Sequence, residues 1–121
     1  MAAVVDWTPV PFSSGHGPHG YALYTVDLAS GDSTTPMLVT GAVATVQLAA
    51  VSGATVTAQG SLEEITPTLW GTMKDTSGTA ISLTTAPSAP VTVQPETNFL
   101  RVLSTGGTST VKLAIRHRPR L

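Results

Sequence analysis

From Tyr21 to Arg116, apolar and polar residues alternate in short runs, and glycine, proline and serine separate these runs. Such alternation places successive side chains on opposite faces of a β-strand, whereas a helix needs a period of about 3.6 residues. Because about eight short strands at this spacing are typical of a sandwich or a small barrel, we expect an all-β fold, a single antiparallel β-sandwich or jelly-roll-like domain. The predicted strands are 21–28, 43–48, 55–59, 69–74, 80–84, 91–94, 99–104 and 109–116.

The two ends of the chain differ from this central region. Over the first 20 residues, proline and glycine recur too densely for a helix or a central strand. The last residues are basic, since four of the six lysines and arginines fall within the last ten positions. We therefore expect an extended N-terminal arm (1–20), a β-sandwich domain (21–116) and a basic C-terminal tail (117–121).

Both ends are candidates for contact with a partner. The arm carries the large apolar residues Trp7 and Phe12, which are unfavourable in water. The arm therefore either wraps its own domain or docks on another subunit, while the tail is either solvated or in contact with a neighbour. The candidate partner-contact residues are Trp7, Pro9, Phe12, Arg101, Arg116, Arg118 and Arg120.

Arg101 joins these candidates because of a predicted hairpin around Gly106–Gly107. A loop of even length places Val102 opposite Val111, so that apolar residues share one face. The same register places Arg101 opposite Lys112, and like charges in this position are destabilising. We expect solvent, or an acidic group from the chain or from a partner, to offset the repulsion.

A second hairpin is predicted around Thr76–Gly78. A three-residue loop with glycine at the left-handed position pairs Met73 with Ile81 and puts Trp70 on the opposite face.

The composition argues against catalysis and against metal or cofactor binding. Only 11% of the residues are charged, the net charge is −1 and cysteine is absent, whereas ordinary domains have about 25% charged residues. The adjacent carboxylates Glu63 and Glu64 point to opposite faces in a strand. His16, His19 and His117 lack further ligands for a metal site, unless three arms meet in a trimer. We expect no enzyme activity, no cofactor, and no nucleic-acid or membrane partner.

Residues 51–116 carry a more specific pattern. A strand ending in Gly60–Ser61, a following tryptophan strand at Trp70, the turn Asp75–Gly78 and the segment Phe99–Val102 resemble small β-sandwich structural proteins of tailed bacteriophages. The chain departs from that pattern at Glu63–Glu64, where an Asp-Gly turn is usual.

This resemblance implies a non-enzymatic virion protein. The expected function is that of a capsid decoration (cement) protein on the capsid surface, assembled in the host cytoplasm. The expected partners are the major capsid protein lattice and further copies of the chain, with a homotrimer favoured. The alternative is a glycan-binding or adaptor module of a phage tail or baseplate, in which Trp70 or Tyr24 forms the sugar platform.

Overall fold

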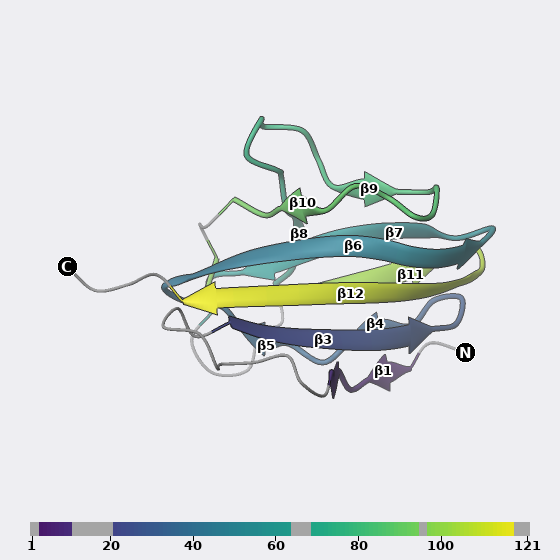
Figure 1. Ribbon diagram of the computed structural model, residues 1–121, viewed down its shortest axis with the longest axis horizontal. Helices are drawn as coiled ribbons and strands as arrows, with labels where there is room; N and C mark the ends of the chain where they lie inside the picture. Colours follow the sequence, from purple (N-terminus) through teal and green to yellow (C-terminus); the bar gives the residue numbers. More distant parts are fainter. Residues whose placement is uncertain (1–2, 11–20, 64–68, 95–96, 118–121) are drawn as a thin grey trace.

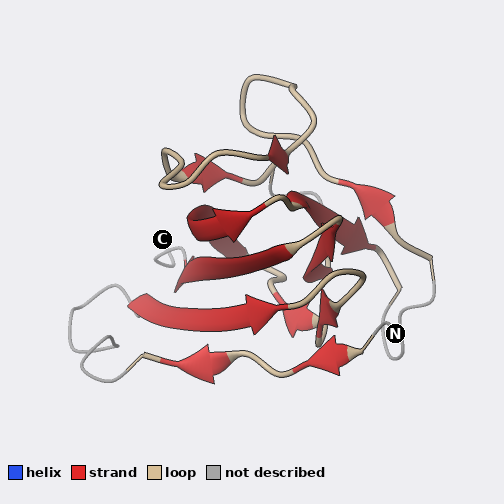
Figure 2. Cartoon of the chain, turned by 90° about the vertical axis from the view of Figure 1, so that its right-hand side faces the viewer, coloured by secondary structure: helices blue, strands red, loops and turns tan. Residues whose placement is uncertain are grey.

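Two β-sheets pack face to face in the computed structural model, which describes residues 3–10, 21–63, 69–94 and 97–117 (Figure 1). Sheet A contains β1 (Val4–Val5), β4 (Ser33–Thr34), β5 (Met37–Leu38), β7 (Thr55–Ser61), β8 (Gly71–Thr72), β9 (Ser82–Leu83) and β11 (Phe99–Thr105). Sheet B contains β2 (Thr8–Pro9), β3 (Tyr21–Leu28), β6 (Ala42–Ser52), β10 (Val91–Thr92) and β12 (Thr108–His117). The predicted all-β sandwich is confirmed. The described residues form no helix, so none of them belongs to a helix able to span a bilayer (Figure 2).

Every predicted strand has a counterpart in the structure. The bounds of β3 agree with the prediction, whereas β8, β9 and β10 shrink to two residues each. The structure adds the two-residue strands β1, β2, β4 and β5. Two residues show no period, so alternation alone does not reveal such strands. The named strands pair antiparallel except β1 and β4, which run parallel, and an isolated parallel bridge joins Gly53 to Thr108.

The core lies between the sheets and takes every second residue of the long strands. In β6 the even-numbered residues from Ala42 to Leu48 are buried. Leu48, Leu100 and Leu113 are fully buried, one each from β6, β11 and β12. Each such leucine stabilises the fold by about 1.5–3 kcal/mol relative to an exposed one.

The predicted hairpin around Gly106–Gly107 is wrong. β11 pairs with β7 in sheet A, and β12 pairs with β6 and β3 in sheet B, so the turn crosses from one sheet to the other. Val102 and Val111 both point into the core, but from facing sheets. Inward alternation is the same for hairpin partners and for strands on facing sheets, so the hydrophobic pattern does not distinguish them.

The second predicted hairpin has the predicted register. Ile81 N–H donates to the Met73 carbonyl at 2.9 Å, and Asp75 N–H donates to the Thr79 carbonyl at 2.8 Å. Gly78 has a φ of 87°, the left-handed conformation that the turn requires. The Asp75 carboxylate accepts the N–H groups of Ser77 and Thr79, which fixes the turn.

Two segments close the sides of the sandwich. On one side the N-terminal segment runs from β1, paired with β4 in sheet A, to β2, paired with β3 in sheet B. On the other side β8 and β9 pair with β7 in sheet A, and β10 pairs with β6 in sheet B. Residues 3–10 of the predicted arm therefore belong to the folded domain and wrap their own chain.

Candidate functional site

The structure describes four of the seven predicted contact residues. Phe12, Arg118 and Arg120 lie outside the described residues, as do His16 and His19. Pro9 is exposed in β2, where it lies opposite Tyr24 of β3. The other three described residues, Trp7, Arg101 and Arg116, occupy different parts of the fold.

Trp7 is part of the core of its own chain. It lies between β1 and β2 and is only 8% exposed. Its indole Nε1 is buried and has no hydrogen-bond partner among the residues that the structure describes. Of the two alternatives for the arm, the structure has Trp7 packed on its own domain, where the N-terminal segment crosses between the sheets.

Arg101 lies near the centre of sheet A and points away from the core, because its neighbours Leu100 and Val102 are buried. Its strand partner is Gln59 of β7 and not Lys112. The guanidinium Nε donates to Gln59 Oε1 at 2.8 Å, and the guanidinium carbon Cζ lies 4.4 Å from the centre of the Trp70 ring. Burial lowers the pKa of Arg101 from its ordinary value, although a guanidinium remains charged at neutral pH.

Around Arg101 the described strands of sheet A carry no other charge, and their outer face combines apolar side chains with hydroxyl side chains such as Thr57 and Thr72. Arg101 is the only charged residue in the strands of sheet A. In the adjacent row Leu38 of β5 lies opposite Phe99 of β11 and is 61% exposed. Leu103 follows Arg101 on the same face, since residues alternate along β11. We call this surface the Arg101 face; it comprises Leu38, Gln59, Trp70, Phe99, Arg101 and Leu103.

The two described cations of β12, Lys112 and Arg116, lie on the other side of the molecule from Arg101. Lys112 is exposed on the outer face of sheet B, between Thr25 and Gln47. Arg116 is exposed farther along the same strand, beside a hollow of about 280 Å³ lined also by Val43. Arg101 and these two cations therefore do not form one basic patch.

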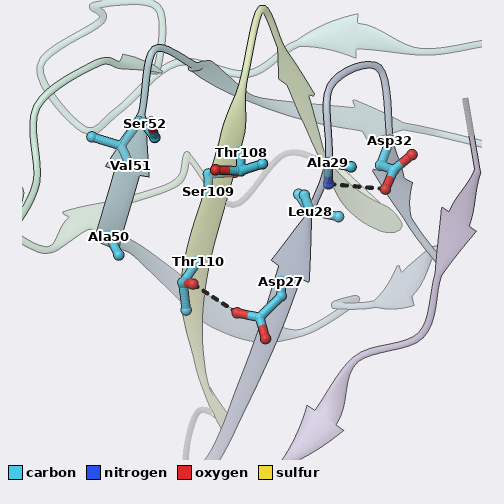
Figure 3. A pocket seen from close by; sticks show the side chains of 10 residues that line it. All are labelled: Asp27, Leu28, Ala29, Asp32, Ala50, Val51, Ser52, Thr108, Ser109 and Thr110. Atoms are coloured by element: carbon cyan, nitrogen blue, oxygen red, sulfur yellow. Dashed lines mark hydrogen bonds between the residues drawn. The ribbon is translucent and has the colours of Figure 1, made fainter. Parts of the chain in front are cut away.

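A larger depression lies at one end of the sandwich (Figure 3). Its volume is about 560 Å³, and its lining combines hydroxyl side chains with the carboxylates of Asp27 and Asp32. Thr110 Oγ1 donates to Asp27 Oδ1 at 2.6 Å, as the dashed line in Figure 3 marks. The Asp32 carboxylate accepts the N–H groups of Ala3 at 3.0 Å and Ala29 at 2.9 Å. Both carboxylates thus have partners within the chain, and Asp32 ties the N-terminal segment to the turn after β3.

Replacing Asp32 with alanine is expected to lower the free energy of unfolding by about 1–2 kcal/mol, because two backbone N–H groups lose their acceptor. Both groups are near enough to the surface for water to replace part of the loss. Asp32→Asn keeps one carbonyl oxygen and is expected to lose about half as much. Chemical denaturation of the two variants checks this order. Equal stability of Asp32→Ala and the native chain would show that the carboxylate does not hold the segment.

Other residues considered from the sequence give no combined site. Tyr24 is half-buried and packs against the core, so it offers no open ring platform. Glu63 Oε1 accepts the N–H of Leu69 at 2.5 Å. Within the described ranges no three His, Asp or Glu side chains are grouped as metal ligands.

Sequence reasoning missed Gln59, Leu38 and Phe99 as members of a common surface. The signal was present in Phe99–Leu103, where large side chains occupy both faces of one strand. A strand with one solvated face normally carries small or polar residues there. The surface was missed because Arg101 was placed beside Lys112 through the wrong hairpin.

Comparisons of the chain with protein-family models, with curated proteins and with solved structures give no match.

Proposed function

We propose that the protein is a non-enzymatic virion structural protein, a capsid decoration protein that binds the assembled head shell of a tailed bacteriophage and stabilises it. The proposal combines the resemblance of residues 51–116 with one observation, the Arg101 face. Protein interfaces have few charges at their centre and are enriched in aromatic residues and arginine. The Arg101 face has this composition.

The low charge of the whole chain agrees with a role in packing against protein. A surface with few charges loses little hydration energy when another protein covers it. Repetition of a modest contact over a lattice, or over the subunits of a homotrimer, raises the overall affinity through effective concentration. A small sandwich with a charge-poor face suits such repeated binding.

The function is tested with empty head shells assembled from the major capsid protein of the genome that encodes this chain; absence of a capsid gene from that genome would overturn the proposal. We expect the purified protein to co-sediment with the shells up to a fixed ratio and to raise their melting temperature. Native mass measurement gives the oligomeric state, for which we propose a trimer. Absence of both co-sedimentation and stabilisation would overturn the proposal, and binding on a glycan array that is lost in Trp70→Ala would favour a glycan-binding module instead.

A further inference from the structure

We infer that the Arg101 face is the docking surface of the protein, and that its partner presents a carboxylate side chain surrounded by apolar residues to Arg101. This inference rests on the proposed function and adds the surface and the chemistry of the partner. Four observations carry it: the isolation of the charge, the fixed geometry of the guanidinium, the exposed apolar residues around it, and the absence of a second cation in the sheet.

The charge of Arg101 is not balanced by a carboxylate in the part of the chain that the structure describes. Within that part, the polar contact of its side chain is the hydrogen bond to Gln59, and its ring contact is with Trp70. Covering a charge without pairing it is strongly unfavourable. A protein that covers this face and supplies an anion at Arg101 avoids this cost.

The guanidinium is held in a fixed orientation that suits a carboxylate. Gln59 occupies the Nε–H, and the Trp70 ring lies against the guanidinium. The N–H groups on Nη1 and Nη2 remain for a partner, and they form a planar pair of donors that matches the two oxygens of a carboxylate. Because Gln59 and Trp70 already restrict the side chain, less conformational entropy is lost on binding.

The surroundings of Arg101 supply apolar contact area. Leu38 is 61% exposed in the row beside Arg101, and Phe99 and Leu103 are half-buried on the same side of β11. Residues that dominate binding energy are enriched in tryptophan and arginine, and surrounding contacts keep water away from them. The Arg101 face has this composition, since Arg101 and Trp70 lie beside the apolar side chains of Leu38, Phe99 and Leu103.

The same features disfavour other occupants. A nucleic acid presents many phosphates and binds through several cations. In the described strands of sheet A, Arg101 is the only cation. A sugar stacks on an open aromatic ring, but the Arg101 guanidinium already lies 4.4 Å from the Trp70 ring. A second copy of the Arg101 face offers no anion to Arg101, because the described strands of sheet A contain no carboxylate.

The test uses the same shells and three variants of the full chain. Arg101→Met removes the charge but keeps a long apolar side chain, and we expect it to weaken shell binding about 30-fold or more. Lys112→Met is the matched control, because it removes an exposed cation from the centre of the other sheet. We expect its affinity to stay within about threefold of the native value. Arg101→Lys keeps the charge without the planar donor pair and is expected to fall between them. Thermal unfolding of each variant checks that the fold is intact.

The outcomes separate the inference from the proposed function. If the native chain binds shells and Arg101→Met binds equally well, the docking surface lies elsewhere and only the inference fails. If Arg101→Lys binds shells as tightly as the native chain, Arg101 does not recognise a carboxylate through its planar pair of donors. Failure of the native chain to bind shells would overturn both proposals.

A second set of variants identifies the carboxylate. Exposed Asp and Glu residues of the shell protein are replaced one at a time by their amides and combined with Arg101→Met in double-mutant cycles. We expect one amide variant to weaken binding of the native chain and to add little to the effect of Arg101→Met. Strictly additive effects at every shell carboxylate would contradict the inference.

Discussion

Replacing Trp7 with alanine is expected to lower the free energy of unfolding by about 3–5 kcal/mol, the usual loss when a buried aromatic residue is removed. Trp7 is 8% exposed and belongs to the same buried cluster as Val26 and Leu28 of β3. Its removal opens a cavity at the point where the N-terminal segment passes from sheet A to sheet B. The loss is measured by chemical denaturation, with Val4→Ala as the control. Val4 lies in the same segment but is 65% exposed, so its truncation is expected to change stability by about 0.5 kcal/mol or less.

The dependence of this stability loss on protein concentration distinguishes the two places where Trp7 could bind. If its ring docks within its own chain, the loss is the same at every protein concentration. If it docks on another subunit, the difference between variant and native chain grows with concentration, because association stabilises only the native chain. Trp7→Phe refines the test, since it keeps most of the apolar ring and removes the unpaired indole N–H. We expect this variant to be clearly more stable than Trp7→Ala.

The alternation of apolar and polar residues predicts the long strands well. β3, β6, β7, β11 and β12 were all predicted within a few residues, because each buries one face and its pattern is therefore unambiguous. The pattern specifies which residues point inward but not which strand lies beside which. Inward residues of β11 and β12 match equally well as neighbours in one sheet or as partners across the core.

Because alternation does not specify strand order, only part of the candidate site could be predicted from the sequence. The sequence indicated that Arg101 points outward and that Trp70 belongs to a strand region, but the pairing of Arg101 with Gln59 depends on sheet order. Sheet order in turn depends on contacts distant in the sequence, which local propensity does not encode. The N-terminal segment was missed for a related reason, since β1 and β2 have only two residues each and are fixed by β4 and β3.

The second large effect on the free energy of unfolding is expected at the turn between β11 and β12, which crosses from sheet A to sheet B. Two crossings meet at one end of the sandwich: Ser52–Ala54 joins β6 to β7, and Gly106–Gly107 joins β11 to β12. A Cβ atom at Gly107 would overlap the carbonyl oxygen of Ser52 and would lie 2.9 Å from the Gly53 carbonyl carbon and 3.0 Å from the Ala54 nitrogen. All three are backbone atoms, so no side chain can rotate to make room.

Gly107→Ala is therefore expected to lower the free energy of unfolding by about 3 kcal/mol, at the upper end of the usual range for overpacking. Gly107 does not have a positive φ, so the loss reports the contact between the two crossings and not backbone strain at the substituted residue. Gly71→Ala is the control, because a Cβ there meets nothing within 4 Å; we expect it to be neutral or to stabilise by about 0.4–1 kcal/mol. Chemical denaturation measures both variants. Equal stability of Gly107→Ala and the native chain would contradict the close contact between the two crossings.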